Sequence, residues 1–74
     1  MDWENINVQF GLVLRKIREA RHLSQEDLAD LCGISRAYYG RIERGEHSAT
    51  LDLCKKLADG LGLTLSAMFE DLIE

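Results

Sequence analysis

Apolar residues recur at intervals of three and four along most of the chain, and this spacing predicts helices. The first stripe is formed by Phe10, Leu14 and Ile17, with Val13 and Ala20 beside it, and predicts a helix over about residues 7–21. Residues 1–6 are interpreted as a loose lead-in. The alternation that is typical of strands is missing throughout the sequence, so we expect an all-α fold.

Two shorter helices follow, over about residues 25–32 and 35–44. Ser24 and Ser35 are the expected N-caps, and Asp27 stands where a capping box places its acidic partner. Gly33 can adopt the positive φ needed for a sharp turn, and Gly45 is the expected end of the second helix. The inward residues are expected to be Leu28, Ala29, Cys32, Tyr39 and Ile42. Two short helices joined by a glycine-containing turn make a helix-turn-helix unit.

The last third of the chain predicts two more helices, each capped by a threonine. Thr50 precedes the apolar stripe Leu51, Cys54, Leu57, Ala58 and Leu61, and Gly60 and Gly62 are expected to end that helix. Thr64 precedes a terminal helix over about residues 64–74, in which Leu65 and Met68 suffice for the core. The remaining apolar residues are Phe69, Leu72 and Ile73. A small domain cannot hide them all, so we expect them to form a two-fold dimer contact; intramolecular packing is the alternative.

Composition narrows the class of protein. Seventy-four residues, 46% of them hydrophobic and none of them proline, predict one compact domain over residues 1–74. No apolar run approaches the roughly 20 residues of a membrane span, and the acidic start lacks a signal peptide's basic region, so we expect a cytoplasmic protein without membrane contact. The cysteines and histidines lack metal-ligand spacing, and no catalytic constellation is evident. We therefore expect no metal, no cofactor and no enzymatic activity.

The net charge of −4 argues against nucleic-acid binding until its distribution is considered. All nine Lys and Arg residues lie between Arg15 and Lys56, where seven acids leave a net charge of +2. Residues 57–74 carry four acids and no base. A locally basic face opposite an acidic one is compatible with DNA binding.

Four motifs carry a family resemblance. They are Gln25-Glu26-x-Leu28-Ala29, Gly33-Ile34-Ser35, Ile42-Glu43-Arg44-Gly45 and Leu57-Ala58-x-x-Leu61-Gly62-Leu63. In this order and spacing they resemble the Cro/repressor (Xre-type) helix-turn-helix family over about residues 10–69. The run over residues 36–45 also resembles the controller proteins of restriction–modification systems. The resemblance implies a five-helix, lambda-repressor-like DNA-binding domain with its helix-turn-helix at helices 2 and 3, and a homodimer.

The resemblance also implies roles for individual residues. Helix 3 is expected to enter the major groove, where the outward residues would contact bases: Ser35, Arg36, Ala37 and Arg41. For Arg41 a phosphate contact is equally plausible. Gly40 is placed on the same outward face, for close approach to DNA or by simple tolerance. The expected phosphate contacts are Gln25, Tyr38, Arg44, His47 and Ser48.

Two structural roles are expected within the same motif. Arg18 and Glu43 would form an ion pair tying helix 1 to helix 3, and the alternative for Arg18 is a phosphate contact. Tyr39 departs from the family, which usually has an aliphatic residue there, and we expect it to be mostly buried with its hydroxyl at the rim.

The leading hypothesis is a dimeric transcription regulator that binds a pseudo-palindromic operator, a controller of a restriction–modification operon. RNA polymerase is a further candidate partner, through Glu26, Asp27 and Asp30, although these acids also serve solubility and capping. The alternatives are an antitoxin or phage-type repressor of the same fold, and a protein-interaction module that has lost DNA binding.

Overall fold

The computed structural model describes residues 3–72, which form five α-helices and a final 3₁₀ turn. The elements are α1 (Trp3–Ala20), α2 (Gln25–Cys32), α3 (Arg36–Glu43), α4 (Leu51–Leu61), α5 (Leu65–Phe69) and η1 (Glu70–Leu72). The prediction of a five-helix, all-α fold is confirmed. Ile73, which was expected at a dimer contact, lies outside the described residues.

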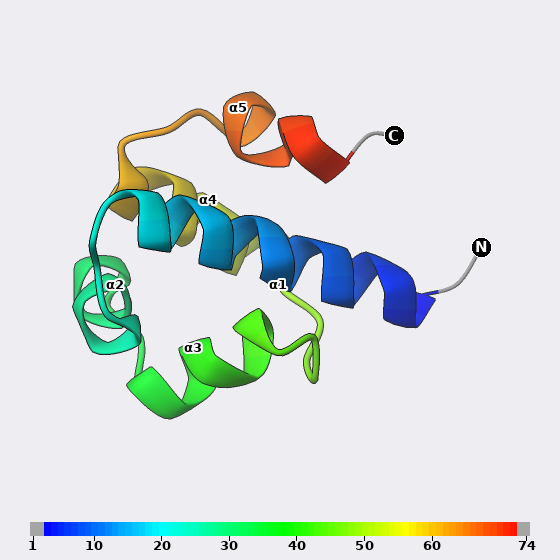
Figure 1. Cartoon of the computed structure of the whole chain (residues 1–74), viewed down its shortest axis with the longest axis horizontal. Helices are drawn as coiled ribbons and strands as arrows, with labels where there is room; N and C mark the ends of the chain where they lie inside the picture. The colour runs from blue at the N-terminus through cyan, green and yellow to red at the C-terminus, as the bar shows by residue number, and fades with distance from the viewer. Residues whose placement is uncertain (1–2, 73–74) are drawn as a thin grey trace.

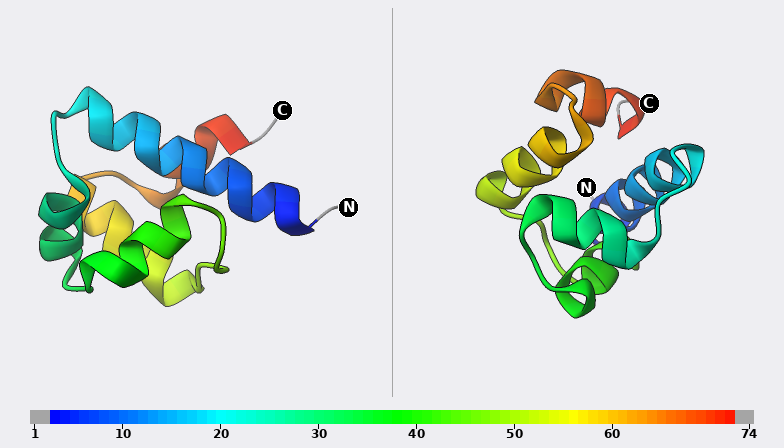
Figure 2. Two further views of the ribbon diagram at one scale, coloured as in Figure 1. Left: turned by 60° about the horizontal axis from the view of Figure 1, so that its bottom comes forward. Right: turned by 90° about the vertical axis from the view of Figure 1, so that its left-hand side faces the viewer.

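The long helix α1 crosses the molecule, with α3 below it and α5 above it in the view of Figure 1. It packs against α3 on one side and against α5 and η1 on the other, while α2 packs against both α3 and α4. The two further views show α2 and α3 as consecutive helices at an angle, with α3 at the edge of the molecule (Figure 2). This arrangement leaves one long side of α3 without a covering helix.

The predicted N-caps are all confirmed. Ser24, Ser35, Thr50 and Thr64 each accept a hydrogen bond from the backbone N–H three residues later, at 2.9–3.1 Å. Asp27 returns a bond to the backbone N–H of Ser24 at 3.0 Å, which completes the capping box. Each such cap stabilises its helix by about 0.5–2 kcal/mol. Gly33 has φ 72°, in the left-handed region that favours glycine, and thereby turns the chain from α2 toward α3.

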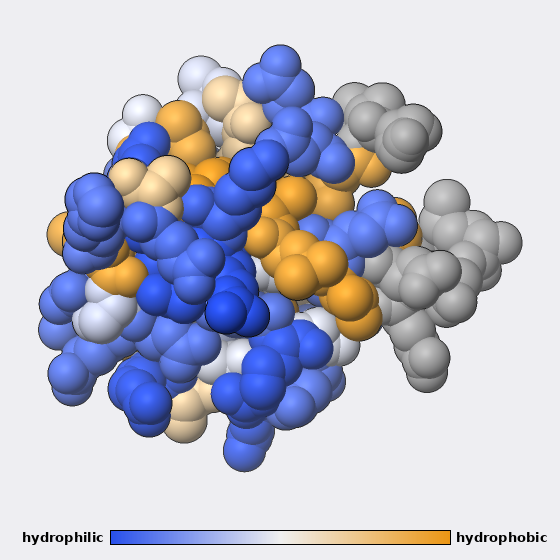
Figure 3. Space-filling model, viewed as in Figure 1, coloured by the Kyte–Doolittle hydropathy of each residue, from blue (hydrophilic) through white to orange (hydrophobic). Residues whose placement is uncertain are grey.

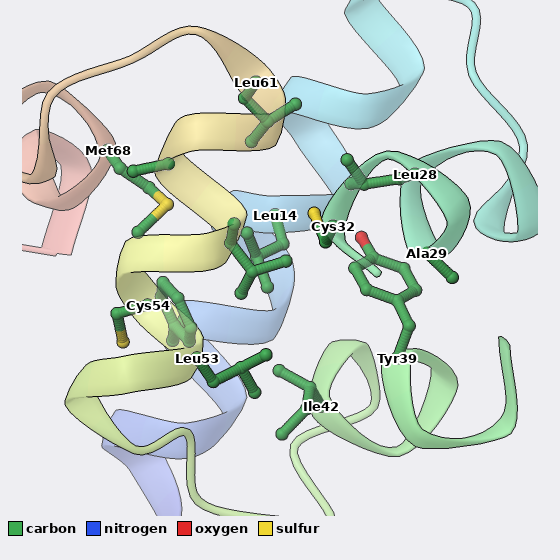
Figure 4. Packing of buried hydrophobic residues seen from close by; sticks show 13 residues of the cluster. Leu14, Leu28, Ala29, Cys32, Tyr39, Ile42, Leu53, Cys54, Leu61 and Met68 are labelled. Carbon is green, nitrogen blue, oxygen red and sulfur yellow. The ribbon is translucent and has the colours of Figure 1, made fainter. Parts of the chain in front are cut away.

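One hydrophobic core lies between the helices, and all five contribute to it (Figure 4). The predicted inward faces of α2 and α3 are buried as expected. Two predictions for the outer helices are wrong: Ala20 is exposed, and Leu51 is 81% exposed. Leu53 takes the core position instead, because it shares a helix face with Leu57 four residues later.

The ends of two helices also differ from the predictions. α1 begins at Trp3 rather than near residue 7, because the segment before Phe10 includes no proline or glycine that would interrupt the helix. α4 runs through Gly60, against the prediction, and continues to Leu61, where Gly62 with φ 69° caps it as predicted. A Cβ at Gly60 would lie 2.8 Å from the sulfur of Cys32, so this glycine lets α4 approach α2 closely.

Gly11 sets the position of α3, and the hydrophobic pattern gave no sign of it. A Cβ on Gly11 would lie 2.1 Å from the carbonyl oxygen of Glu43, a distance that no side chain can occupy. The backbones of α1 and α3 are therefore in direct contact at the last turn of α3. Because α3 is held this closely at its end, its outward side has a fixed orientation.

Polar and apolar atoms are separated on the surface. In the view of Figure 3, hydrophobic residues gather where α1 passes beneath α5, whereas the lower part, over α3, is mostly hydrophilic. No helix within residues 3–72 is both long and apolar enough to cross a lipid bilayer.

Candidate nucleic-acid interface

The outward side of α3 presents two arginines and a small residue to solvent. Arg36, Ala37 and Arg41 are all exposed. Within residues 3–72, neither Arg36 nor Arg41 takes part in an ion pair, so both guanidinium groups keep their full hydrogen-bonding capacity. A guanidinium matches the O6 and N7 acceptors of guanine in the major groove, and the methyl group of alanine suits the methyl of thymine.

Ser35 lies at the start of this surface and also caps α3. Its hydroxyl oxygen accepts the backbone N–H of Tyr38 at 3.1 Å, as the N-cap of α3. The hydroxyl proton is not used by that bond and remains available for a donor bond to a base or a phosphate.

Behind the outward surface, Arg18 and Glu43 meet as a two-point ion pair. Arg18 Nε and Nη2 each donate to a different carboxylate oxygen of Glu43 at 2.9 Å, and Arg18 Nη1 donates to the carbonyl oxygen of Leu23 at 2.8 Å. The two side chains are only 13% and 5% exposed. The pair therefore connects α1 to α3 in a setting where charge-assisted bonds are strong.

Glu43 keeps its charge despite its burial. Burial alone raises the pKa of a carboxyl group, but hydrogen bonds from Arg18, Tyr39 and Gln25 together hold the pKa of Glu43 below its ordinary value. Tyr39 is fully buried, and its hydroxyl donates to Glu43. The expectation that this hydroxyl reaches the rim is wrong, because the carboxylate beneath the surface offers it an acceptor in the interior.

Gln25 is half-buried at the start of α2, beside the carboxylate of Glu43. Its Nε2 donates one N–H to Glu43 Oε1 at 3.1 Å, which fixes the direction of the amide and leaves its second N–H unused by that bond. The start of α2 also carries the partial positive charge of a helix N-terminus. This combination of a fixed amide donor and a helix start is suited to a phosphate oxygen.

Gly40 is buried beneath two of the predicted phosphate contacts, so its placement on the outward face is wrong. A Cβ there would lie 3.0 Å from Arg44 Nη1 and 3.7 Å from Gln25 Oε1. The glycine instead leaves room for the side chains of Arg44 and Gln25 to cross over α3.

The other predicted phosphate contacts, Tyr38 on α3 and three residues of the loop after it, each have a partner within the protein. Arg44 pairs with Glu46, Nε to Oε2 at 2.9 Å, and the hydrogen bond lowers the pKa of the Glu46 carboxyl. His47 packs edge-on against the half-buried Tyr38, with ring centres 5.5 Å apart, and its Nδ1 lies 3.1 Å from the Ser48 carbonyl oxygen. Ser48 Oγ accepts a bond from the Asn7 amide at 3.2 Å. The structure thus brings Tyr38 and His47 together, while Arg44 shares its charge with an acid.

Phe69 and Leu72, the residues expected at a dimer contact, lie on the far side of α1 from α3. Both are half-buried against the core, and Phe69 packs edge-on against Phe10 with ring centres 5.8 Å apart. They line a mainly apolar pocket of about 220 Å³, to which Cys54 also contributes. The exposed Leu51 lies one helical turn before Cys54 on α4.

Comparison with known proteins agrees with this geometry. Residues 14–68 match the helix-turn-helix family. The chain is 41% identical over 69 residues to the control protein C.MunI of a Mycoplasma species, covering 92% of this chain and 93% of that protein. It is 40% identical over 60 residues to control protein C.BamHI of Bacillus amyloliquefaciens, covering 80% and 74% of the two chains.

A solved structure is similar over nearly the same extent. The restriction–modification controller protein C.AhdI from Aeromonas hydrophila superposes with a TM-score of 0.88 at 40% identity, covering 93% of this chain and all of that one. The family match, the relatives and the fold together show that this chain belongs to the helix-turn-helix family of DNA-binding transcriptional regulators.

Proposed function

We propose that this protein is a cytoplasmic, homodimeric controller of a restriction–modification operon, which reads a pseudo-palindromic operator through α3. The observation that carries the DNA-reading part is the outward side of α3, where Arg36 and Arg41 are exposed and form no ion pair within the described part of the chain. The assignment to restriction–modification is supported by the likeness to C.MunI, C.BamHI and C.AhdI.

The neighbouring groups suit the phosphates on either side of a groove. Gln25 at the start of α2 is proposed to hold a phosphate on one side of α3. The other proposed phosphate contacts are Tyr38 on α3 and His47 and Ser48 in the loop over residues 44–50. Arg44 contributes less than a free arginine because Glu46 offsets its charge and is itself repelled by DNA. In this proposal base reading rests on Arg36, with Ala37, Arg41 and the Ser35 hydroxyl beside it.

A second copy of the chain is proposed to cover the apolar pocket at Phe69 and Leu72. An 81% exposed leucine, Leu51, lies close to a pocket that is lined by apolar side chains. In a two-fold contact the same surface meets itself, so the Leu51 side chain of each subunit can enter the other's pocket. Such a dimer would place two α3 helices in successive major grooves, about 34 Å apart.

Only some of the acidic residues of α2 are available for a contact with RNA polymerase. Asp27 is committed to the Ser24 cap, and that bond lowers the pKa of its carboxyl. Glu26 and Asp30 are exposed on α2, so a polymerase contact through this helix would rest on these two.

The test is base preference rather than affinity alone. Binding of the wild type and of Arg36→Ala is measured on a duplex selected from random sequence and on variants with each guanine replaced, over a range of salt concentrations. Arg36→Ala should lose about 1–3 kcal/mol of discrimination at one base pair in each half-site. Lys55→Ala is the matched control, since it removes one positive charge from α4, where Lys55 pairs with Asp59 at 2.8 Å. Equal base preference in Arg36→Ala and wild type would contradict the proposal.

A further inference from the structure

The carboxylate of Glu43 accepts four hydrogen bonds from three helices or their ends. Oε2 accepts from Arg18 Nε and from the Tyr39 hydroxyl, and Oε1 accepts from Arg18 Nη2 and Gln25 Nε2. The oxygen that holds Gln25 and the oxygen that holds Tyr39 thus belong to one rigid group. Anything that fixes the rotation of this carboxylate also fixes the direction in which the Gln25 amide points.

The hydroxyl of Tyr39 is well placed to fix that rotation. Its ring is fully buried in the core, where Leu28, Ala29 and Cys32 of α2 lie around it (Figure 4). Burial raises the pKa of its phenol above the ordinary value, so the group stays protonated and acts as a donor. Residues 39 and 43 are one helical turn apart, so the bond attaches the carboxylate to the preceding turn of α3 itself.

The other donors hold the carboxylate from other helices. The planar guanidinium of Arg18 holds both carboxylate oxygens from α1, and its third bond, to the carbonyl oxygen of Leu23, fixes it there, so it orients the carboxylate relative to α1. Gln25 holds only Oε1 and is the group being oriented. Tyr39 is the donor to Glu43 that lies on the same helix as the base-reading arginines. Its bond therefore holds the carboxylate, which belongs to α3 itself, in one orientation relative to that helix.

We propose that Tyr39 is a positioning residue for DNA binding, whose hydroxyl sets the orientation of Gln25 through the shared carboxylate of Glu43. The proposal rests on the phosphate contact that the proposed function gives to Gln25. The sequence predicts for Tyr39 a mostly buried side chain with its hydroxyl at the rim. The proposal instead gives this hydroxyl a role that an aliphatic residue of similar burial cannot perform.

The first test uses the protein without DNA. Tyr39→Phe keeps the buried ring and removes only the hydroxyl. The side-chain amide protons of Gln25 are followed by nuclear magnetic resonance in the wild type and in this variant. We expect the two amide resonances of Gln25 to move toward each other and to exchange with solvent several-fold faster in Tyr39→Phe.

The control for the first test is Ile42→Val, a small loss of packing on the same buried side of α3, where Ile42 is 1% exposed. This variant loosens the core without touching the carboxylate, so it should leave the Gln25 resonances in place. Unchanged Gln25 resonances in Tyr39→Phe, or the same change in Ile42→Val, would overturn the proposal.

The second test is a double-mutant cycle in DNA affinity with Tyr39→Phe and Gln25→Ala. Tyr39→Phe alone should weaken binding by roughly three- to tenfold, which corresponds to the net value of one hydrogen bond. In the Gln25→Ala background the same change should have no further effect, because its route to the phosphate is gone. Additive losses would overturn the proposal.

The two tests separate the two claims. If Gln25→Ala binds DNA as tightly as the wild type, the phosphate contact of the proposed function is wrong. The amide resonances of the DNA-free protein then decide by themselves whether Tyr39 orients Gln25.

Discussion

Replacing Arg18 by alanine should destabilise the fold more than any other single change in an arginine. The variant loses two bonds to Glu43 and one to the carbonyl of Leu23, and it leaves a carboxylate with 5% exposure without a counter-charge. Removing one partner of a buried pair costs about 3–5 kcal/mol. Since Arg18 retains 13% exposure, we expect the lower end of that range, about 3 kcal/mol. A chain of this length has a total stability of about 4–11 kcal/mol, so the loss is a large fraction.

Thermal denaturation at one fixed protein concentration measures this effect. A loss of about 3 kcal/mol corresponds to a fall in Tm of about 12–24 °C for a domain of this size. Arg15→Ala is the matched control on the same helix, because Arg15 pairs with Glu19 at 3.1 Å with both side chains more than half exposed. Such surface pairs contribute about 0–1 kcal/mol. If Arg18→Ala melts like Arg15→Ala while binding DNA more weakly, Arg18 contacts phosphate and the structural role is refuted.

The pH dependence of the two proteins should differ in sign. In the wild type the pKa of Glu43 is lower in the folded than in the unfolded chain, so its contribution is present above the ordinary pKa of about 4.3 and is lost as the pH falls below it. In Arg18→Ala the guanidinium no longer offsets the burial of Glu43, so the pKa of Glu43 rises above its ordinary value. Protonation of Glu43 at low pH then removes the unpaired buried charge and reduces the destabilisation of the variant. Urea titrations between pH 7 and about pH 3 should therefore show the stability difference between the two proteins shrinking toward low pH. A difference that stays constant over this range would contradict the electrostatic explanation.

Two further changes test the packing and the dimer. Gly11→Ala should cost about 3 kcal/mol or more, because its Cβ would lie 2.1 Å from the Glu43 carbonyl oxygen. Gly33→Ala is the control, because its Cβ would meet no atom within 4 Å and the change costs only the strain of a φ of 72°, about 1–2 kcal/mol. Equal losses of stability in the two glycine variants, measured by urea denaturation, would refute the close contact at Gly11. Leu51→Ser should leave the stability of the dilute subunit within about 0.5 kcal/mol and raise the dimer dissociation constant by at least about tenfold. Sedimentation equilibrium measures that constant, and an unchanged value would remove Leu51 from the interface.

The sequence predicted the helices well because their ends are marked by local chemistry. A serine or threonine precedes each of α2 to α5, and each makes the expected cap. α1 has no such marker near residue 7, and its start was misplaced by a turn. Leu51 was wrongly assigned to the core, because a three- and four-residue stripe fits both Leu51 and Leu53 and only the tertiary arrangement decides between them.

The site was less predictable than the fold. Exposure of Arg36, Ala37 and Arg41 follows from the helical period once Tyr39 and Ile42 are known to face inward. The crossing at Gly11 and the burial of Gly40 depend on distances between helices, which leave no periodic signal in the sequence. Tyr39 stands where the family usually has an aliphatic residue, and this difference was the only sign in the sequence that its hydroxyl has a role. It did not show that the hydroxyl donates to Glu43.

Selection of bound sites from random duplexes tests most directly whether two outward-facing α3 helices read DNA together. The enriched sequences should contain two inverted half-sites whose centres lie about 10–10.5 base pairs apart, with a guanine in each half-site that Arg36→Ala no longer requires. Enrichment of no sequence, or of a single half-site without symmetry, would contradict the reading of DNA by a two-fold dimer.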